Sequence, residues 1–250
     1  MTSTARRRSA RAWQADRMAS FSAFDSRGYR TVAPREGYDR WAATYEETVE
    51  DAMDVALLER LGIDWGAVGS VADLGCGTGR TGAWLGARGV GEIDGVDLSP
   101  GMLEPARARG VYRSLREGEV GATDLEAAAY GAAVSCLVDE HLADLGPLYA
   151  EAARLLAPGG RFVVVGFHPH FIIASGMPTH FDDAESGEPV AIETHVHMLS
   201  EHVAAGTGAG LTLAELHERV VDDEWVALKP KWERFRDHPI SFAFVWVGKG

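Results

Sequence analysis

The sequence has few cysteines, fewer basic than acidic residues and no long apolar segment. The 2 cysteines, Cys76 and Cys136, are too few for a disulfide framework or a zinc set, and they are typical of small buried residues in a reducing compartment, here expected to be the cytoplasm. The 24 Lys and Arg against 37 Asp and Glu give a net charge of −13, which argues against a broad nucleic-acid-binding face. No apolar run reaches the roughly 18 to 20 residues that span a bilayer, so no membrane partner is expected.

The feature that organises the rest of the chain is residues 71–80, Val-Ala-Asp-Leu-Gly-Cys-Gly-Thr-Gly-Arg. The apolar start predicts a buried strand, the three alternate glycines predict a tight turn, and residues 80–85 are compatible with a helix. A strand, a glycine turn and a helix in this order open a nucleotide-binding βαβ unit. Glycine is needed there because the backbone approaches a ligand closely and because such turns often require a positive φ.

The spacing of these glycines separates two classes of ligand. In the dinucleotide pattern G-x-G-x-x-G, the third glycine would fall at Arg80. The spacing therefore argues against a nicotinamide-dependent oxidoreductase. A second strand over residues 92–96 ends at Asp97, where a carboxylate can accept both ribose hydroxyls of a nucleoside.

Four ordered motifs can be compared with known families. They are Asp73-x-Gly75-x-Gly77-x-Gly79, Gly95-x-Asp97-x-Ser99-Pro100-x-Met102, the Leu-Leu-Ala-Pro-Gly-Gly-Arg-Phe turn of residues 155–162, and the Tyr38–Tyr45 helix. Together they resemble the class I S-adenosylmethionine-dependent methyltransferases, in the small-molecule branch of types 11 and 12. The resemblance covers roughly residues 38 to 165. It implies an α/β fold, a Rossmann-like sandwich with a mostly parallel seven-stranded sheet and helices on both faces.

The resemblance also implies S-adenosyl-L-methionine as cofactor, with S-adenosyl-L-homocysteine as product. The glycines would let the backbone approach the methionine portion, Asp73 would hold its amino group through backbone or water, Asp97 would hold the ribose, and Glu119 would accept from the adenine amino group. The expected cofactor-binding residues are Tyr38, Tyr45, Asp73, Gly75, Cys76, Gly77, Gly79, Asp97, Leu98, Met102, Glu119, Val120 and Val138.

We expect a single methyltransferase domain over residues 23–250, preceded by an Arg-rich stretch, 1–22, that is either a disordered tail or a lid. Alternating residues predict a hairpin over 179–197, inserted after strand five. Further strands are expected over residues 111–116, 132–138, 161–167, 211–221 and 240–247. The domain then divides into N-terminal cap helices (37–62), a cofactor core (68–167), a substrate-side insertion (168–199) and a C-terminal part (200–250).

Six of the nine histidines lie between residues 168 and 202. Three interpretations remain open for them: a general base in an acceptor pocket, since imidazole titrates near neutrality; a metal site of paired imidazoles; or ordinary structural histidines. No metal-ligand motif is present, so no metal is expected. The candidates for the base are Glu140, His141, His168 and His195.

The predicted reaction is in-line displacement of the sulfonium methyl by a small-molecule acceptor, at oxygen or nitrogen rather than carbon. The Asn/Asp-Pro-Pro-Tyr/Phe signature of amino-methylating nucleic-acid enzymes is absent near residues 138–141. The alternatives are a non-catalytic cofactor-binding partner protein and a methyltransferase acting on a protein or RNA. A homodimer and a single copy are both left open.

Overall fold

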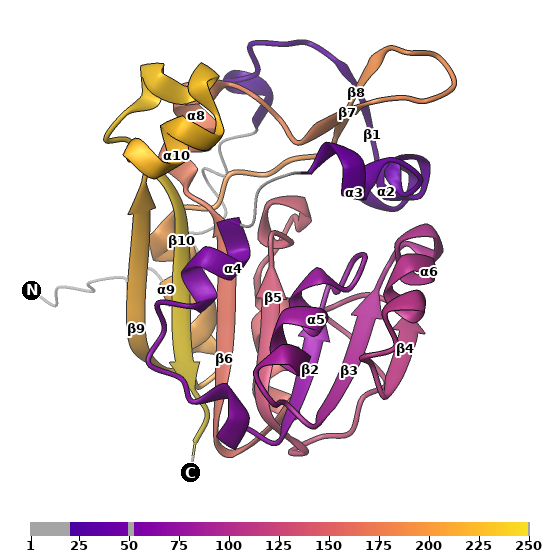
Figure 1. Cartoon of the computed structure of the whole chain (residues 1–250). Helices are drawn as coiled ribbons and strands as arrows, with labels where there is room; N and C mark the ends of the chain where they lie inside the picture. Colours follow the sequence, from indigo (N-terminus) through magenta and orange to yellow (C-terminus); the bar gives the residue numbers. More distant parts are fainter. Residues whose placement is uncertain (1–20, 50–52, 250) are drawn as a thin grey trace, which may run out of the picture.

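The computed structural model describes residues 21–49 and 53–249, so the predicted stretch 1–22 lies almost wholly outside the described residues. A seven-stranded sheet in the order β4-β3-β2-β5-β6-β10-β9 forms the centre of the molecule (Figure 1). In this sheet β10 alone runs in the direction opposite to the other six strands, which confirms the mostly parallel sheet predicted from the motifs. The strands are β2 (Ser70–Leu74), β3 (Glu92–Asp97), β4 (Ser114–Glu117), β5 (Tyr130–Cys136), β6 (Leu156–Phe167), β9 (Thr212–Val220) and β10 (Pro239–Val247).

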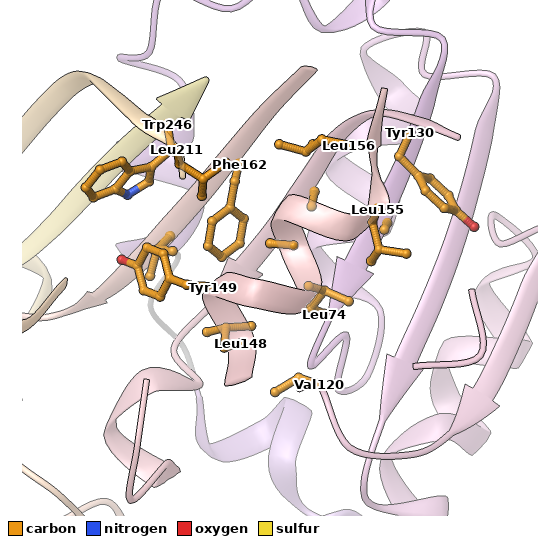
Figure 2. Close-up of a cluster of buried hydrophobic side chains, with 14 of the residues drawn as sticks. Leu74, Val120, Tyr130, Leu148, Tyr149, Leu155, Leu156, Phe162, Leu211 and Trp246 are labelled. Atoms are coloured by element: carbon orange, nitrogen blue, oxygen red, sulfur yellow. The ribbon is translucent and has the colours of Figure 1, made fainter. Parts of the chain in front are cut away.

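Helices cover both faces of this sheet because alternate strand residues point to opposite sides. On one face α4 (Met53–Leu58) and α5 (Arg80–Ala87) pack over Val71, Val163 and other apolar strand residues. On the other face α7 (Gly146–Leu155) and α9 (Leu199–Gly208) cover a cluster that includes Tyr149, Phe162 and Trp246 (Figure 2). Helix α6 (Pro100–Arg109) contacts β3 and β4. Among the helices of residues 21–49 and 53–249, none has the length and apolar character needed to cross a membrane.

A second, three-stranded sheet lies beyond the carboxyl ends of the parallel strands (Figure 1). Its hairpin, β7 (His180–Asp182) and β8 (Pro189–Ile192), confirms the insertion predicted after strand five. Strand β1 (Arg30–Val32) pairs in parallel with β8, which the sequence did not predict. A three-residue strand carries too little periodicity to be recognised without its partner.

The region predicted as helical over 37–62 is divided into short helices. They are α2 (Pro34–Trp41), α3 (Tyr45–Thr48) and α4, with the 3₁₀ turn η2 (Trp65–Ala67) after them. Helix α2 contacts α6 and β8, and Val32, Trp41, Phe181 and Ile192 form a small core between α2 and the three-stranded sheet. The first part of the predicted helical region, α2, thus packs with the three-stranded sheet, and the two together are called the cap. The last part, α4, packs on the main sheet.

Some predicted boundaries shift. The strand expected over 111–116 begins at Ser114, and the strand expected over 132–138 runs from Tyr130 to Cys136. Strand β6 begins at Leu156, directly after α7, so the Pro-Gly-Gly turn lies inside a long, irregular strand. The remaining elements are η1 (Phe21–Ala23), η3 (Asp139–His141), α8 (Pro169–Ser175), α10 (Asp223–Leu228) and η4 (Pro230–Phe235).

Candidate active site

A cavity of about 480 Å³ opens at the carboxyl ends of β2, β3 and β5, beside α2 and α3. The chain runs from β2 outward through β3 to β4 and then returns to β5 on the other side, so the strand order reverses between β2 and β5. Open parallel sheets bind their ligands at such a reversal point. All of the predicted cofactor-binding residues except Asp73 and Gly79 line this cavity, namely Tyr38, Tyr45, Gly75, Cys76, Gly77, Asp97, Leu98, Met102, Glu119, Val120 and Val138.

The glycine loop forms the middle of the cavity wall. Gly75 and Gly77 have φ of +79° and +52°, a backbone region that favours glycine. A Cβ placed on Gly75 would lie 2.3 Å from Cγ2 of Val138, so any side chain there would collide with the end of β5. The loop is therefore shaped both by its backbone conformation and by its close approach to the neighbouring strand.

Asp97, at the end of β3, is fixed by backbone donors. Its Oδ2 accepts a hydrogen bond from Gly77 N–H (2.7 Å), and its Oδ1 accepts one from Ser99 N–H (2.9 Å). Burial is the main cause of a raised pKa for this carboxyl group. Each carboxylate oxygen can accept a second bond, so Asp97 is held in place and still able to bind two hydroxyl groups.

Asp73 and Gly79 lie behind the cavity. Asp73 is 1% exposed and accepts a hydrogen bond from the Tyr112 hydroxyl (2.7 Å), and burial raises its pKa to about 7. Gly79 has φ +81° as the N-cap of α5, and a Cβ there would meet Tyr112 and Ala106. The structure therefore gives the Asp73 side chain a partner within the protein, and Asp73 does not line the cavity.

Of the four candidate bases, the structure brings His141 to the cavity. Its Nδ1 lies 2.8 Å from the carbonyl oxygen of Glu193, which can only accept, so Nδ1 carries the proton. The lone pair on Nε2 then accepts the hydroxyl hydrogen of Tyr38 (2.9 Å), which also lines the cavity. Burial lowers the pKa of His141 and raises that of Tyr38, so both are neutral near pH 7.

The other three candidates do not line the cavity. Glu140 is 4% exposed and accepts a hydrogen bond from Thr179 Oγ1 (2.5 Å). His168 caps α8 and lies 2.8 Å from Glu218 through Nε2, and His195 lies 3.6 Å from Glu193. Within residues 21–49 and 53–249, no three His, Cys, Asp or Glu side chains come together as a metal site.

Sequence reasoning missed part of the cavity wall. Asp54, Arg80 and Thr81 line it together with Cys136, at the end formed by α4 and the first turn of α5. Arg80 was considered only as the residue that replaces a dinucleotide glycine. Asp54 gave no signal, because a lone acidic residue in a helical pattern is most often on a solvated face.

Comparisons with known proteins show which family the chain resembles. Residues 72–164, which run from β2 into β6, match the model of the methyltransferase domain. Over these residues the chain is similar to the methyltransferases. This match covers the glycine loop, Asp97 and the end of β5, which are the parts of the methyltransferase domain that surround the cavity.

Relatives agree with this assignment. The chain is 42% identical over 86 residues to human methyltransferase-like protein 27, covering 31% of this chain and 34% of that protein. It is 31% identical over 160 residues to demethylmenaquinone methyltransferase of Tropheryma whipplei, covering 59% of this chain and 64% of that protein. The chain thus spans between one third and two thirds of the length of these relatives.

The fold of the methyltransferase domain also agrees with solved structures. An S-adenosylmethionine-dependent methyltransferase from Mesorhizobium loti superposes with a TM-score of 0.64 at 22% identity, over 79% of this chain and 98% of that one. A similar enzyme from Listeria monocytogenes gives a TM-score of 0.65 at 18% identity, over 79% of this chain and 97% of that one. At these identities the comparison establishes the fold alone.

Proposed function

We propose that this protein transfers a methyl group from S-adenosylmethionine to an oxygen or nitrogen atom of a small-molecule acceptor. The observation that carries the proposal is the cavity at the strand-order reversal, in which the glycine loop and the fixed carboxylate of Asp97 lie side by side. The names of two relatives support parts of this proposal: demethylmenaquinone methyltransferase supports a small-molecule acceptor, and malonyl-[acyl-carrier protein] O-methyltransferase supports an oxygen atom.

The residues of the cavity fit the cofactor. Its volume of about 480 Å³ falls within the range of roughly 300–1,000 Å³ typical of small-molecule sites. Asp97 would hold the ribose hydroxyls. The adenine would be enclosed by the apolar side chains of Leu98, Met102 and Val120, with Glu119 at the rim of the cavity. When bound, S-adenosylmethionine supplies a methyl group already activated by the sulfonium, so the protein mainly aligns the reactants and excludes water.

The acceptor side of the cavity contains Tyr38 and His141. His141 offers a lone pair on Nε2, and its lowered pKa keeps that nitrogen unprotonated near neutral pH. An acceptor hydroxyl that replaces the Tyr38 hydroxyl at Nε2 would give its proton to His141 as the oxygen–methyl bond forms and the methyl–sulfur bond breaks, with S-adenosylhomocysteine as the leaving group. An acceptor ammonium would first lose a proton to His141 and then attack as the neutral amine. Before the acceptor enters, the Tyr38 hydroxyl thus occupies Nε2 of His141 through its hydrogen bond.

The alternatives predict different results. A non-catalytic partner protein would bind the cofactor and transfer no methyl group to any acceptor. A methyltransferase for protein or RNA would need a docking surface beside the cavity, and the net charge of −13 disfavours RNA. We also propose a cytoplasmic location for the protein. We further propose a division of its domain into a core (68–167), an insertion (168–199), a C-terminal part (200–250) and N-terminal helices (37–62), of which α2 belongs to the cap and α4 packs on the main sheet.

The cofactor assignment can be tested by calorimetry. We expect the native protein to bind S-adenosylhomocysteine with micromolar affinity, and Asp97→Ala to weaken binding about 10- to 100-fold, because two hydrogen bonds to a charged group are lost. Asp223→Ala removes the same charge from an exposed position on α10 and serves as the control. Folded native protein that binds neither S-adenosylhomocysteine nor S-adenosylmethionine would refute the proposal.

We also propose that a second copy of the chain binds at the edge of the main sheet. Strand β9 pairs only with β10 in the described part of the chain. Most of the exposed large apolar side chains lie on β9 or at α9, namely Met198, Val203, Leu213, Leu216 and Val220. Antiparallel pairing of two β9 strands about Leu216 would place Glu215 of one copy opposite His217 of the other, so the two side chains that lie 2.8 Å apart within one chain would also face each other across the interface.

This homodimer is tested by light scattering during size-exclusion chromatography. We expect a dimeric mass for the native protein and a monomeric mass for Leu216→Asp, since a carboxylate in the apolar seam would be desolvated without a partner. Leu228→Asp is the control, because Leu228 is 53% exposed on α10, outside β9 and α9. A native protein that elutes as a monomer at all concentrations would rule out the β9 interface.

A further inference from the structure

One end of the cavity contains an acid and a base that the reaction described above does not use. Asp54 on α4 and Arg80 in the first turn of α5 both line the cavity, beside Thr81 and Cys136. Oδ2 of Asp54 lies 3.3 Å from a guanidinium nitrogen of Arg80. Oδ1 of Asp54 is buried and has no hydrogen-bond partner among residues 21–49 and 53–249, although the residue is only 3% exposed.

A buried carboxylate oxygen without a donor is unfavourable, and native proteins rarely leave one in that state. Because Asp54 faces the cavity, a ligand can supply the missing donor. An ammonium group carries three donors and a positive charge, whereas a guanidinium has the planar geometry that matches a carboxylate. A neighbouring acid and base in one cavity are therefore complementary to a ligand with both an ammonium and a carboxylate group.

The order of the strands shows which part of the cofactor would lie there. Asp97 ends β3, the glycine loop follows β2, and Cys136 ends β5, and these strands are adjacent in the order β3-β2-β5. A ligand with its ribose on Asp97 and its middle on the glycine loop points its other end toward β5, where Asp54 and Arg80 lie.

We propose that Asp54 and Arg80 bind the amino-acid end of S-adenosylmethionine, with Asp54 accepting from the ammonium group and Arg80 donating to the carboxylate. This inference rests on the proposed function. It replaces the role predicted for Asp73, whose carboxylate lies outside the cavity wall and already accepts from Tyr112.

Three ligands that differ only at this end provide the test. S-adenosylhomocysteine has both charged groups, its decarboxylated analogue keeps only the ammonium, and 5′-methylthioadenosine has neither. By calorimetry, we expect native protein to bind S-adenosylhomocysteine at least about tenfold more tightly than methylthioadenosine. Equal affinity for the two would overturn the inference without any variant.

Two variants separate the roles of the residues. Asp54→Asn should weaken S-adenosylhomocysteine and its decarboxylated analogue about tenfold or more, and Arg80→Met should weaken only the ligand that has the carboxylate. Neither should change the affinity for methylthioadenosine by more than about twofold. Far-UV circular dichroism and thermal unfolding check that each variant is folded, and Asp223→Asn controls for the loss of charge.

The outcomes distinguish this inference from the proposed function. If the native protein binds neither S-adenosylhomocysteine nor methylthioadenosine, the cofactor assignment itself fails. If it binds both and the variants weaken all three ligands equally, or none of them, the cofactor assignment stands and the roles of Asp54 and Arg80 are wrong. Selective loss of the charged ligands supports the inference.

Discussion

Replacement of His141 by Asn is expected to reduce the rate of methyl transfer about 10²- to 10⁴-fold, the contribution typical of a general base. Asn can still donate to the Glu193 carbonyl oxygen, as Nδ1 of His141 does over 2.8 Å. It has no lone pair of suitable basicity to take the place of Nε2, which faces the Tyr38 hydroxyl. The variant should therefore keep the shape of the site and lose the proton acceptor.

The measurement uses radiolabelled S-adenosylmethionine with a stated set of acceptors: catechol, histamine, a malonyl thioester and demethylmenaquinol. The acceptor that the native protein methylates is then used with the variants. His168→Asn is the matched control, because His168 caps α8 outside the cavity wall and should affect the rate little. Equal rates for the native protein and His141→Asn would exclude His141 as the base.

The same base gives the reaction a pH dependence of known sign. Burial lowers the pKa of His141 from its usual value of 6.5, and the neutral form is the one that accepts a proton. The rate should therefore be constant through neutral pH and fall on acidification, with a midpoint below 6.5. A midpoint at or above 6.5 would show that the charged imidazole is stabilised, contrary to its buried position.

The sequence could predict the parts of this site that depend on short-range patterns. The loop at Gly75 and Gly77 requires a conformation that few other residues adopt, so its glycines are visible in the sequence. Asp97 is recognisable because it ends the next predicted strand after that loop. In both cases the signal is local: it consists of the residue type, its spacing from its neighbours and its position at the end of a strand.

The remaining parts depend on contacts between distant segments. Asp54 contacts Arg80 only because α4 packs beside α5, and no local pattern distinguishes it from an exposed acid. Sequence reasoning also could not choose His141 among the histidines. The choice depends on a contact between Nδ1 of His141 and the carbonyl oxygen of Glu193, which lies far from His141 in the sequence. Asp73 stands next to the loop in sequence, yet the Tyr112 hydroxyl and burial take its side chain out of the cavity wall.

Glu140 is buried beside His141, and its hydrogen-bond donor is a hydroxyl group rather than a cation. Its side chain is 4% exposed, it accepts from Thr179, and it lies next to Asp139. Burial is the main cause that raises its pKa from 4.5 to about 8, with the Asp139 charge adding to it and the Thr179 hydrogen bond opposing it. Glu140 is thus largely protonated at neutral pH and adds no negative charge beside His141, whose pKa burial lowers although the charges of Asp139 and Glu193 oppose that shift.

This raised pKa links the stability of the fold to pH. Between pH 4.5 and about 8 the unfolded chain has lost the Glu140 proton while the folded chain keeps it, so the free energy of unfolding falls as pH rises. Glu140→Gln keeps an acceptor for Thr179 and has no proton to lose. The free energy of unfolding of the variant, minus that of the native protein, should therefore grow by about 3 to 5 kcal/mol from acidic to mildly alkaline pH.

Urea unfolding at several pH values measures this difference, with Glu104→Gln, an exposed residue on α6, as the control. Burial raises the pKa of Asp73 to about 7, so the free energy of unfolding of both proteins also falls with rising pH because of Asp73. Only the difference between the two proteins therefore reports on Glu140. A difference that does not change with pH would mean that Glu140 is ionised in the folded state. In that case Nε2 of His141 would lie 3.4 Å from a negatively charged oxygen of Glu140. The pKa of His141 would then be raised rather than lowered. The pH below which the rate of methyl transfer falls would rise with that pKa.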